Sequence, residues 1–484
     1  MAQGLEHKVA SGVAWSFSEK LLTMVIQMAV SIIVARELMP EDFGVMAILT
    51  FFTSVALTIV DSGFSQALIR KASPSDQEYA SVLGFNVVVS VALYGVLLLA
   101  TPAIASFYGL PVIAKVAPVL FLVLPINSLC VVQTVLFTRE FRFALLSKIV
   151  FVASLVSGAV AVVMALVGCG IWSLVAQRLL MMGIKALAFW WIGRWRSGAS
   201  MSLRCLRGLA PFSLRLLATD LIASIYNNVA QLFIAKIYST AELGFYAQAQ
   251  KLKELPVTST VQAVQGVTYP ALSSLKEDEQ KFCAGYERIV SMVAFVIFPV
   301  MLGLVAIAED MFMLLLGQKW MATVPYFEIL ALAGLFYPLA MVSYNVLKVR
   351  SDGRVIVRLE LVKRIVMTVV LCVAIPRGVV AVAWGMTAMA LVEFLLNTLM
   401  ALRYVSLGVV RLVRALMPSL LLAVAMYLAL EVLNPYVEHL HIVLRLLVDT
   451  LGGALLYILL AWLLRLAQLK EVWRLLGSML AKSE

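Results

Sequence analysis

Charged residues interrupt several of the long apolar stretches of this 484-residue chain. An ionised side chain among apolar groups is costly, so it generally faces a polar cavity or an oppositely charged partner. Such cations could bind an anionic ligand, and such acids could exchange a proton or bind Na⁺. The cations in question are Lys20, Arg178, Lys185, Arg215, Lys251 and Lys253. The acids are Glu19, Asp61, Asp220, Glu254 and Glu393.

The charges of the first half each have a functional and a structural interpretation. Glu19 and Lys20 are adjacent, so on a helix they address different partners, either a cavity ligand or a neighbouring helix. Arg178 and Lys185 lie seven residues apart, on one helix face that would suit an anionic ligand. Lys185 could instead extend its ammonium group to the membrane surface.

A polar stripe marks the run that starts near residue 209. Arg215 and Asp220 begin it, and Asn227, Asn228 and Gln231 continue it. Polar groups in an apolar helix are expected to face a cavity. The stripe therefore predicts a cavity lining in the second half of the chain.

Three charged residues precede a proline inside the next run. Lys251 and Glu254 share a helix face by their i, i+3 spacing and can neutralise each other, which leaves Lys253 free for a ligand. Pro256 has no backbone donor and is expected to kink the helix there. This pattern predicts a gate at Pro256, with a buried ion pair that holds packing as the alternative.

An isolated acid occurs late in the second half. Glu393 has Asn397 four residues further on, on the same helix face. These two residues could couple transport to a proton or Na⁺ gradient, or a protonated Glu393 could pack helices together. Two other sets predict local ion pairs: Glu360 with Lys363 and Arg364, and Arg445 with Asp449.

Composition places these residues in a membrane protein. The chain is 63% hydrophobic and 13% charged, whereas soluble domains average roughly 45–50% apolar and about 25% charged residues. A helix needs about 20 mostly apolar residues to cross the hydrocarbon layer. Runs of this kind start near Val9, Phe43, Tyr79, Ile113, Leu145, Trp172, Leu209, Leu243, Tyr286, Thr323, Leu359, Val380, Ala415 and Val443. The predicted fold class is all-α, with about fourteen transmembrane helices.

A repeat of about 200 residues divides these runs into two sets. Ala35-Arg36 is followed by Gly44, and Ala235-Lys236 is followed at the same spacing by Gly244. A corner built twice is typical of a transporter with two homologous halves, here in parallel orientation. The repeat predicts a six-helix lobe over 1–194, a linker over 195–208, a second six-helix lobe over 209–402, two extra helices over 403–464 and a tail over 465–484.

The distribution of Lys and Arg predicts the orientation. If the N-terminus is cytoplasmic, all but five of the cations outside the apolar runs also fall on the cytoplasmic side. The exceptions are Arg36, Lys115, Lys236, Lys319 and Arg377. The positive-inside rule then places both termini in the cytoplasm. The net charge of +11 fits anionic membrane lipids as partners, without nucleic acid.

Short motifs in order along residues 9–405 resemble one known family. The matching segments are Ser11-Gly12-Val13-Ala14-Trp15, Pro40-Glu41-Asp42-Phe43-Gly44, Asp61-Ser62-Gly63-Phe64, Ala67-Leu68-Ile69-Arg70, Leu243-Gly244-Phe245-Tyr246, Leu255-Pro256, Tyr269-Pro270-Ala271-Leu272-Ser273 and Gly317-Gln318-Lys319-Trp320. They resemble the polysaccharide transporter branch of the multidrug/oligosaccharidyl-lipid/polysaccharide (MOP) flippase superfamily, and within it the colanic acid exporter type of lipopolysaccharide biosynthesis protein. Tyr269 departs from that pattern, which usually has Phe there.

The resemblance implies an architecture and an activity. It implies two six-helix lobes around a central cavity, in a multi-pass protein of the bacterial inner membrane. It also implies a flippase that moves an undecaprenyl-diphosphate-linked oligosaccharide, the repeat unit of an O-antigen, capsule or exopolysaccharide, by alternating access. Polysaccharide assembly proteins are implied partners, and no cofactor is expected beyond a coupling H⁺ or Na⁺.

Two other functions compete with this interpretation. A multidrug/cation antiporter of the same superfamily would concentrate acids in its cavity, whereas this chain places several cations there. A membrane glycosyltransferase or polymerase would display an acid, base or metal site in a sizeable external loop, and the external loops here are short. The sequence has only three histidines and no metal-spaced cluster, so we expect no enzyme and no metal site.

Overall fold

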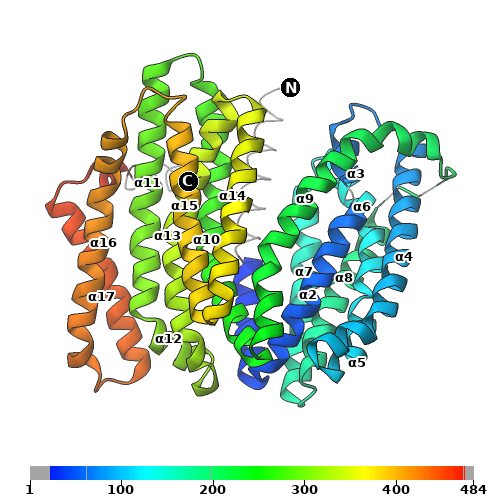
Figure 1. Ribbon diagram of the computed structural model, residues 1–484, viewed down its shortest axis with the longest axis horizontal. Helices are drawn as coiled ribbons and strands as arrows, with labels where there is room; N and C mark the ends of the chain where they lie inside the picture. The colour runs from blue at the N-terminus through cyan, green and yellow to red at the C-terminus, as the bar shows by residue number, and fades with distance from the viewer. Residues whose placement is uncertain (1–21, 62, 194, 197, 472–473, 475–484) are drawn as a thin grey trace. The chain divides into compact units, whose positions relative to one another are not determined.

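The computed structural model describes residues 22–61, 63–193, 195–196, 198–471 and 474. Within these ranges the regular elements are α-helices and two short 3-10 helices, and the described residues form no strand. Contacts divide the chain into two compact units, Met1–Gly244 and Phe245–Glu484. Figure 1 labels the helices of both units.

The first unit holds a helix over residues 22–37 followed by eight labelled helices. These are α2 (Pro40–Asp61), α3 (Phe64–Arg70), α4 (Asp76–Tyr108), α5 (Pro111–Leu120), α6 (Val123–Arg139), α7 (Phe143–Leu166), α8 (Ile171–Ile192) and α9 (Leu203–Ile237). Helix α10 (Thr240–Ser274) starts in this unit and continues into the second.

The second unit contains most of α10 and the remaining helices. These are α11 (Glu279–Ala306), α12 (Ala308–Leu315), η1 (Gln318–Thr323), α13 (Val324–Arg350), α14 (Gly353–Ala374), η2 (Ile375–Arg377), α15 (Val379–Ala401), α16 (Val409–Val437) and α17 (Ile442–Leu463). Helix α13 packs between α11 and α15, and α16 lies beside α11 (Figure 1).

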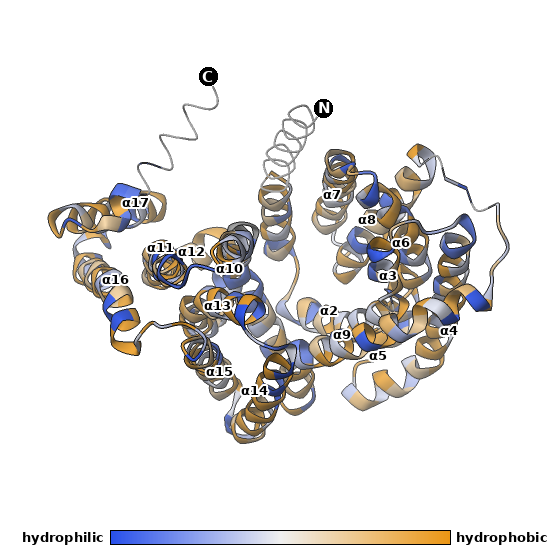
Figure 2. Ribbon diagram, turned by 90° about the horizontal axis from the view of Figure 1, so that it is seen from above, coloured by the Kyte–Doolittle hydropathy of each residue, from blue (hydrophilic) through white to orange (hydrophobic). Residues whose placement is uncertain are grey.

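The predicted class, an all-α polytopic membrane protein, is confirmed. Eleven helical segments among the described residues are long and apolar enough to cross a membrane, judged by length and composition. The charged helices α10 and α14 and the helix over 22–37 correspond to the other three expected runs. Many apolar residues are exposed, such as Leu99 at 83%, and Figure 2 shows apolar residues over most of α4, α15 and α16. Such surfaces suit contact with lipid tails.

The repeated glycines meet the first turn of the opposite copy. A Cβ added to Gly44 would collide with the carbonyl oxygen of Thr240, and one added to Gly244 would collide with that of Pro40. Thr240 begins α10 and Pro40 begins α2. The two corners predicted from the sequence therefore pack reciprocally, and each requires the absence of a side chain.

Helix α9 packs within the first unit. It contacts α2, α3 and α4, and Leu206 joins a core cluster with Phe64 and Tyr79. The helix begins at Leu203, inside the segment 195–208 that the sequence assigned to a linker. The boundary between compact units falls at Gly244, and the lobe boundaries drawn from the repeat stay a prediction.

The last two helices are fastened to the second unit by polar contacts. The Tyr457 hydroxyl of α17 donates to the Phe295 carbonyl of α11 at 3.0 Å. Arg445 forms an ion pair with Asp310 of α12, a partner that the sequence did not indicate, and its charge also acts on Asp449, the partner that the sequence suggested. The contact across helices brings the guanidinium group to a carboxylate that is 135 residues away in the sequence.

Candidate functional site

Three charged residues from separate helices are near enough to interact electrostatically in the first unit. Asp61 ends α2, Lys185 lies on α8 and Asp220 on α9. The charges of Lys185 and Asp220 both act on the Asp61 carboxylate. The Lys185 ammonium also lies 5.4 Å from the ring centre of Phe189. Two of the acids expected to bind a coupling ion are therefore neighbours of one cation expected to bind substrate.

An open groove adjoins this cluster between α3 and α9. Its volume is about 430 Å³, and its lining residues are Gln66, Ile69, Arg70, Phe212, Leu216 and Asp220. On α9, Phe212, Leu216 and Asp220 follow one another at intervals of four residues. On α3, Ile69 and Arg70 follow Gln66 by three and four residues. Each set therefore lies along one helix face. The Arg70 guanidinium carbon stacks 4.8 Å from the ring centre of Phe212. The groove thus has a cation near one end and an acid at the other.

The turn at Gly63 sets the position of α3 against α9. Gly63 has φ 69°, a left-handed conformation that side chains disfavour. Its Cα approaches the Ser213 carbonyl and Leu216 of α9 so closely that an added Cβ would lie 2.7 Å from the oxygen. Glycine therefore serves both the turn and the close approach of the two groove walls.

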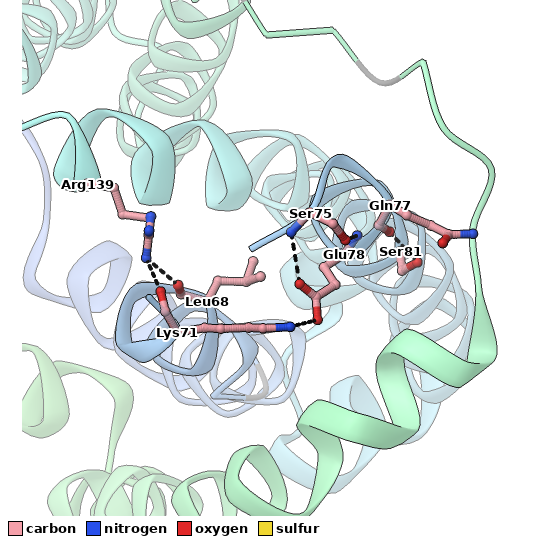
Figure 3. A network of polar contacts seen from close by, with 7 residues as sticks. All are labelled: Leu68, Lys71, Ser75, Gln77, Glu78, Ser81 and Arg139. Atoms are coloured by element: carbon pink, nitrogen blue, oxygen red, sulfur yellow. Dashed lines mark hydrogen bonds and ion pairs between the residues drawn. The ribbon is translucent and has the colours of Figure 1, made fainter. Parts of the chain in front are cut away.

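The far end of α3 is held by Arg139 of α6. Its guanidinium donates to the carbonyls of Leu68 at 2.9 Å and Lys71 at 2.5 Å (Figure 3). It also donates to the Ala72 carbonyl at 2.7 Å. A cation is favourable at this position because the last carbonyls of a helix are unsatisfied and carry partial negative charge. Arg139 thereby fixes the segment that carries Arg70.

The loop after α3 is fixed on its other side by α4. Figure 3 shows Lys71 reaching Glu78, at 2.5 Å. Glu78 and Ser75 form a capping box, in which the Ser75 backbone donates to Glu78 at 2.9 Å. Contacts from α6 and from α4 therefore both fix the end of α3, where Arg70 lines the groove.

The other predicted cations of the first unit lie outside this groove. Arg178 of α8 and Arg215 of α9 are both exposed, and neither lines the groove. Glu19 and Lys20 lie outside the described residues. Substrate binding by Lys20, Arg178 and Arg215 and ion coupling by Glu19 therefore stay predictions.

A second polar cluster lies in the second unit around Lys363. The Lys363 side chain is 6% exposed, and its ammonium contacts the Glu393 carboxylate of α15 at 3.2 Å and also pairs with Glu360 of its own helix. Arg364 approaches Glu360 at 3.7 Å. The local pairs predicted for α14 are present, but Glu393 is not the isolated acid that the sequence indicated, because α14 and α15 pack side by side.

Tyr337 of α13 joins the acids of this cluster. The charges of Glu393, Glu254 and Glu360 all act on its phenol group. Glu254 comes from α10, where its carboxylate accepts a hydrogen bond from Gln250 at 3.0 Å. The neighbouring Lys253 is half-buried, and Lys251 is exposed. Four helices thus bring polar groups to one region of the second unit.

Asn397 lies where α15 packs against α13, and Pro256 lies inside α10. Asn397 is fully buried, and its amide donates to the Ala340 carbonyl of α13 at 3.2 Å. Helix α10 continues through Pro256 to Ser274, so the proline does not end it. The gate at Pro256 and the coupling role of Asn397 stay predictions.

Sequence reasoning missed most of the groove. Gln66, Phe212 and Leu216 were not singled out. Arg70 was noted as a cation outside the apolar runs and as the end of one family-like segment, but not as a ligand-binding residue. Their helical spacing is visible in the sequence, but the pairing of α3 with α9 is not. Among the described residues, no group of three or more His, Cys, Asp or Glu side chains could hold a metal ion.

Comparisons with known proteins identify relatives of this chain. A family model described as polysaccharide biosynthesis protein matches residues 33–325. Teichuronic acid biosynthesis protein TuaB of Bacillus subtilis (strain 168) is 23% identical over 461 residues, which cover 94% of this chain and 95% of TuaB. Lipopolysaccharide biosynthesis protein WzxC of Escherichia coli (strain K12) is 23% identical over 336 residues, 68% of each chain.

Solved structures share the fold. The lipid II flippase MurJ, in an inward closed conformation, matches with a TM-score of 0.74 at 13% identity, over 93% of this chain and 98% of MurJ. An inward-facing multidrug resistance MATE family transporter of the MOP superfamily matches with a TM-score of 0.60 at 16% identity, over 79% of this chain and 94% of the transporter. The fold is therefore that of the MOP superfamily. Because the family model covers more than half of its length, this chain belongs to the polysaccharide biosynthesis protein family.

Proposed function

We propose that this protein moves an undecaprenyl-diphosphate-linked oligosaccharide from the inner to the outer leaflet of the bacterial inner membrane. The match of residues 33–325 to the polysaccharide biosynthesis family is the observation that carries the proposal. The shared fold with a lipid II flippase supports it, since that protein's substrate is a lipid. The oligosaccharide would be the repeat unit of an O-antigen, capsule or exopolysaccharide.

Alternating access is the mechanism that we propose for this movement. The two halves of the repeat would expose the cavity first to one side of the membrane and then to the other. Pro256 would give α10 a flexible point for this change. The diphosphate would be attracted by the intramembrane cations, which are Lys20, Arg178, Lys185, Arg215, Lys251 and Lys253.

Coupling to a proton or Na⁺ gradient forms part of the proposal. An ion biases two access states only if it binds one of them better than the other. Asp61 and Asp220, which lie near Lys185, are the best-placed acids for this role in the first unit. Glu254, Glu393 and Asn397 are the corresponding groups in the second, and Glu19 completes the set. Protonation of Glu393 would weaken its contact with Lys363.

The rival multidrug antiporter remains the second candidate, because a MATE transporter has the same fold. Organic cations require acids that are free to bind them. Two acids of the second unit, Glu360 and Glu393, are instead engaged by Lys363. This arrangement favours an anionic substrate over a cationic drug.

Deletion of the gene separates the two candidates. We expect the deletion strain to accumulate lipid-linked oligosaccharide in the inner leaflet and to lose the surface polysaccharide. Increased sensitivity to cationic drugs with normal polysaccharide would instead establish the antiporter. Purified protein in proteoliposomes should then flip the extracted lipid-linked oligosaccharide, with the gradient dependence read from imposed pH or Na⁺ differences.

The topology belongs to the proposal as well. Both termini and the segment near Arg204 would be cytoplasmic, and anionic lipids and polysaccharide assembly proteins would be the partners. A cysteine introduced at position 240 should react with a membrane-impermeant maleimide in intact cells, and one at position 204 should not. The opposite labelling pattern would invert the proposed orientation.

A further inference from the structure

The α3–α9 groove holds polar groups that the described contacts leave available. Arg70 is exposed and stacks on Phe212, and the described part of the chain records no hydrogen bond or ion pair to its guanidinium. Gln66 and Asp220 are exposed and likewise lack such a contact within that part. Stacking covers the face of a guanidinium and leaves the N–H groups at its edge to bind an anion.

The groove walls have the chemistry of a sugar site. A carboxylate and an amide accept and donate the hydrogen bonds that sugar hydroxyls need. Phe212, Leu216 and Ile69 supply apolar surface between Arg70 and Asp220. Phe212 and Asp220 are eight residues apart, so the helix separates them by about 12 Å at 1.5 Å per residue. The volume of about 430 Å³ falls within the usual range for small-molecule sites.

We propose that the α3–α9 groove binds an anionic sugar. Arg70 holds a phosphoryl or carboxylate group, and Gln66 and Asp220 hold hydroxyls of the ring. The anion has two sources, either the phosphate that links the first sugar to its carrier or an acidic sugar within the glycan. This inference rests on the proposed function, since it names the part of the saccharide that the first unit recognises.

The test uses the full-length protein in lipid nanodiscs and three small probes. Glucose 1-phosphate carries the phosphoryl group, glucuronate carries the carboxylate, and methyl glucoside is neutral. Their affinities are measured by saturation-transfer NMR for wild type, Arg70→Ala, Arg70→Lys, Gln66→Ala and Asp220→Asn. Arg142→Ala is the matched control, because Arg142 also stacks on a ring, that of Phe137 at 5.2 Å, but lies outside the groove.

We expect at least one anionic sugar to bind more tightly than methyl glucoside. Arg70→Ala should weaken that sugar about tenfold, because a charged hydrogen bond is lost. Arg70→Lys should recover part of the loss, since lysine keeps the charge but not the planar fork. Gln66→Ala and Asp220→Asn should weaken the neutral sugar as well, and Arg142→Ala should change none of the affinities.

The outcomes decide two questions: which group supplies the anion, and whether the groove binds a sugar at all. Preference for glucose 1-phosphate assigns the groove to the carrier phosphate, and preference for glucuronate assigns it to an acidic sugar. Equal affinities for all three probes, or an unchanged affinity in both Arg70→Ala and Gln66→Ala, overturn the proposal. Flipping by the same wild-type preparation reports on the proposed function separately, since a protein that flips but does not bind the probes refutes only the groove.

Discussion

The ion pair between Lys363 and Glu393 provides a quantitative test of the packing in the second unit. The two charged atoms are 3.2 Å apart, and the two side chains are 6% and 23% exposed. Coulomb's law at an effective dielectric constant of about 20 gives an attraction of about 5 kcal/mol at that distance. Desolvation of both ions offsets much of this attraction.

Removal of Lys363 and removal of Glu393 should lower the free energy of unfolding by different amounts. Lys363→Met leaves Glu393 without its cation, so we expect a loss of about 3 kcal/mol in the free energy of unfolding. Glu393→Gln leaves Lys363 paired with Glu360, which is 34% exposed, so its cost should be about 1–2 kcal/mol. The double variant Lys363→Met with Glu393→Gln should be more stable than Lys363→Met alone, because no unpaired buried charge remains.

Unfolding in mixed micelles, titrated with SDS, measures these four proteins under one condition. Arg354→Met is the control, because its contact with Asp352 spans 3.9 Å between side chains that are 87% and 71% exposed. An exposed pair contributes little, so the control should stay within about 0.5 kcal/mol of wild type. If the two single effects add to within about 0.5 kcal/mol in the double variant, the reasoning is refuted.

Three further substitutions test other contacts. Arg139→Ala should destabilise the first unit by about 1–3 kcal/mol, because several carbonyls at the end of α3 lose their donor; faster proteolysis of the loop after α3 would report it, and unchanged proteolysis would contradict it. Gly44→Ala should lower the melting temperature in detergent, because its Cβ collides with the Thr240 carbonyl, whereas Gly95→Ala, whose Cβ meets nothing within 4 Å, should not. Equal melting of the two would show that the corner yields freely. Pro256→Ala should slow flipping while substrate binding and expression stay near normal, and an unchanged flipping rate would show that the proline has only a structural role.

The sequence alone determined the class of the fold and its internal repeat. Hydropathy is a local property, so runs of about 20 apolar residues predict helices without knowledge of their neighbours. The glycine corners at Gly44 and Gly244 could also be located, because a repeat is visible as spacing. Asp61, Asp220 and Lys363 could be identified from the sequence too, because each is a charged residue within an apolar run.

Only the tertiary structure decided which of these groups meet. Periodicity shows which residues share a helix face, but not which helix packs against that face. The sequence therefore suggested only Asp449, on the same helix, as a partner of Arg445, whereas α17 packs beside α12 and Arg445 also pairs with Asp310. The groove lined by Arg70 and Phe212 could not be predicted from the sequence either. Its two walls come from helices about 140 residues apart, and their contact depends on the packing of the whole unit.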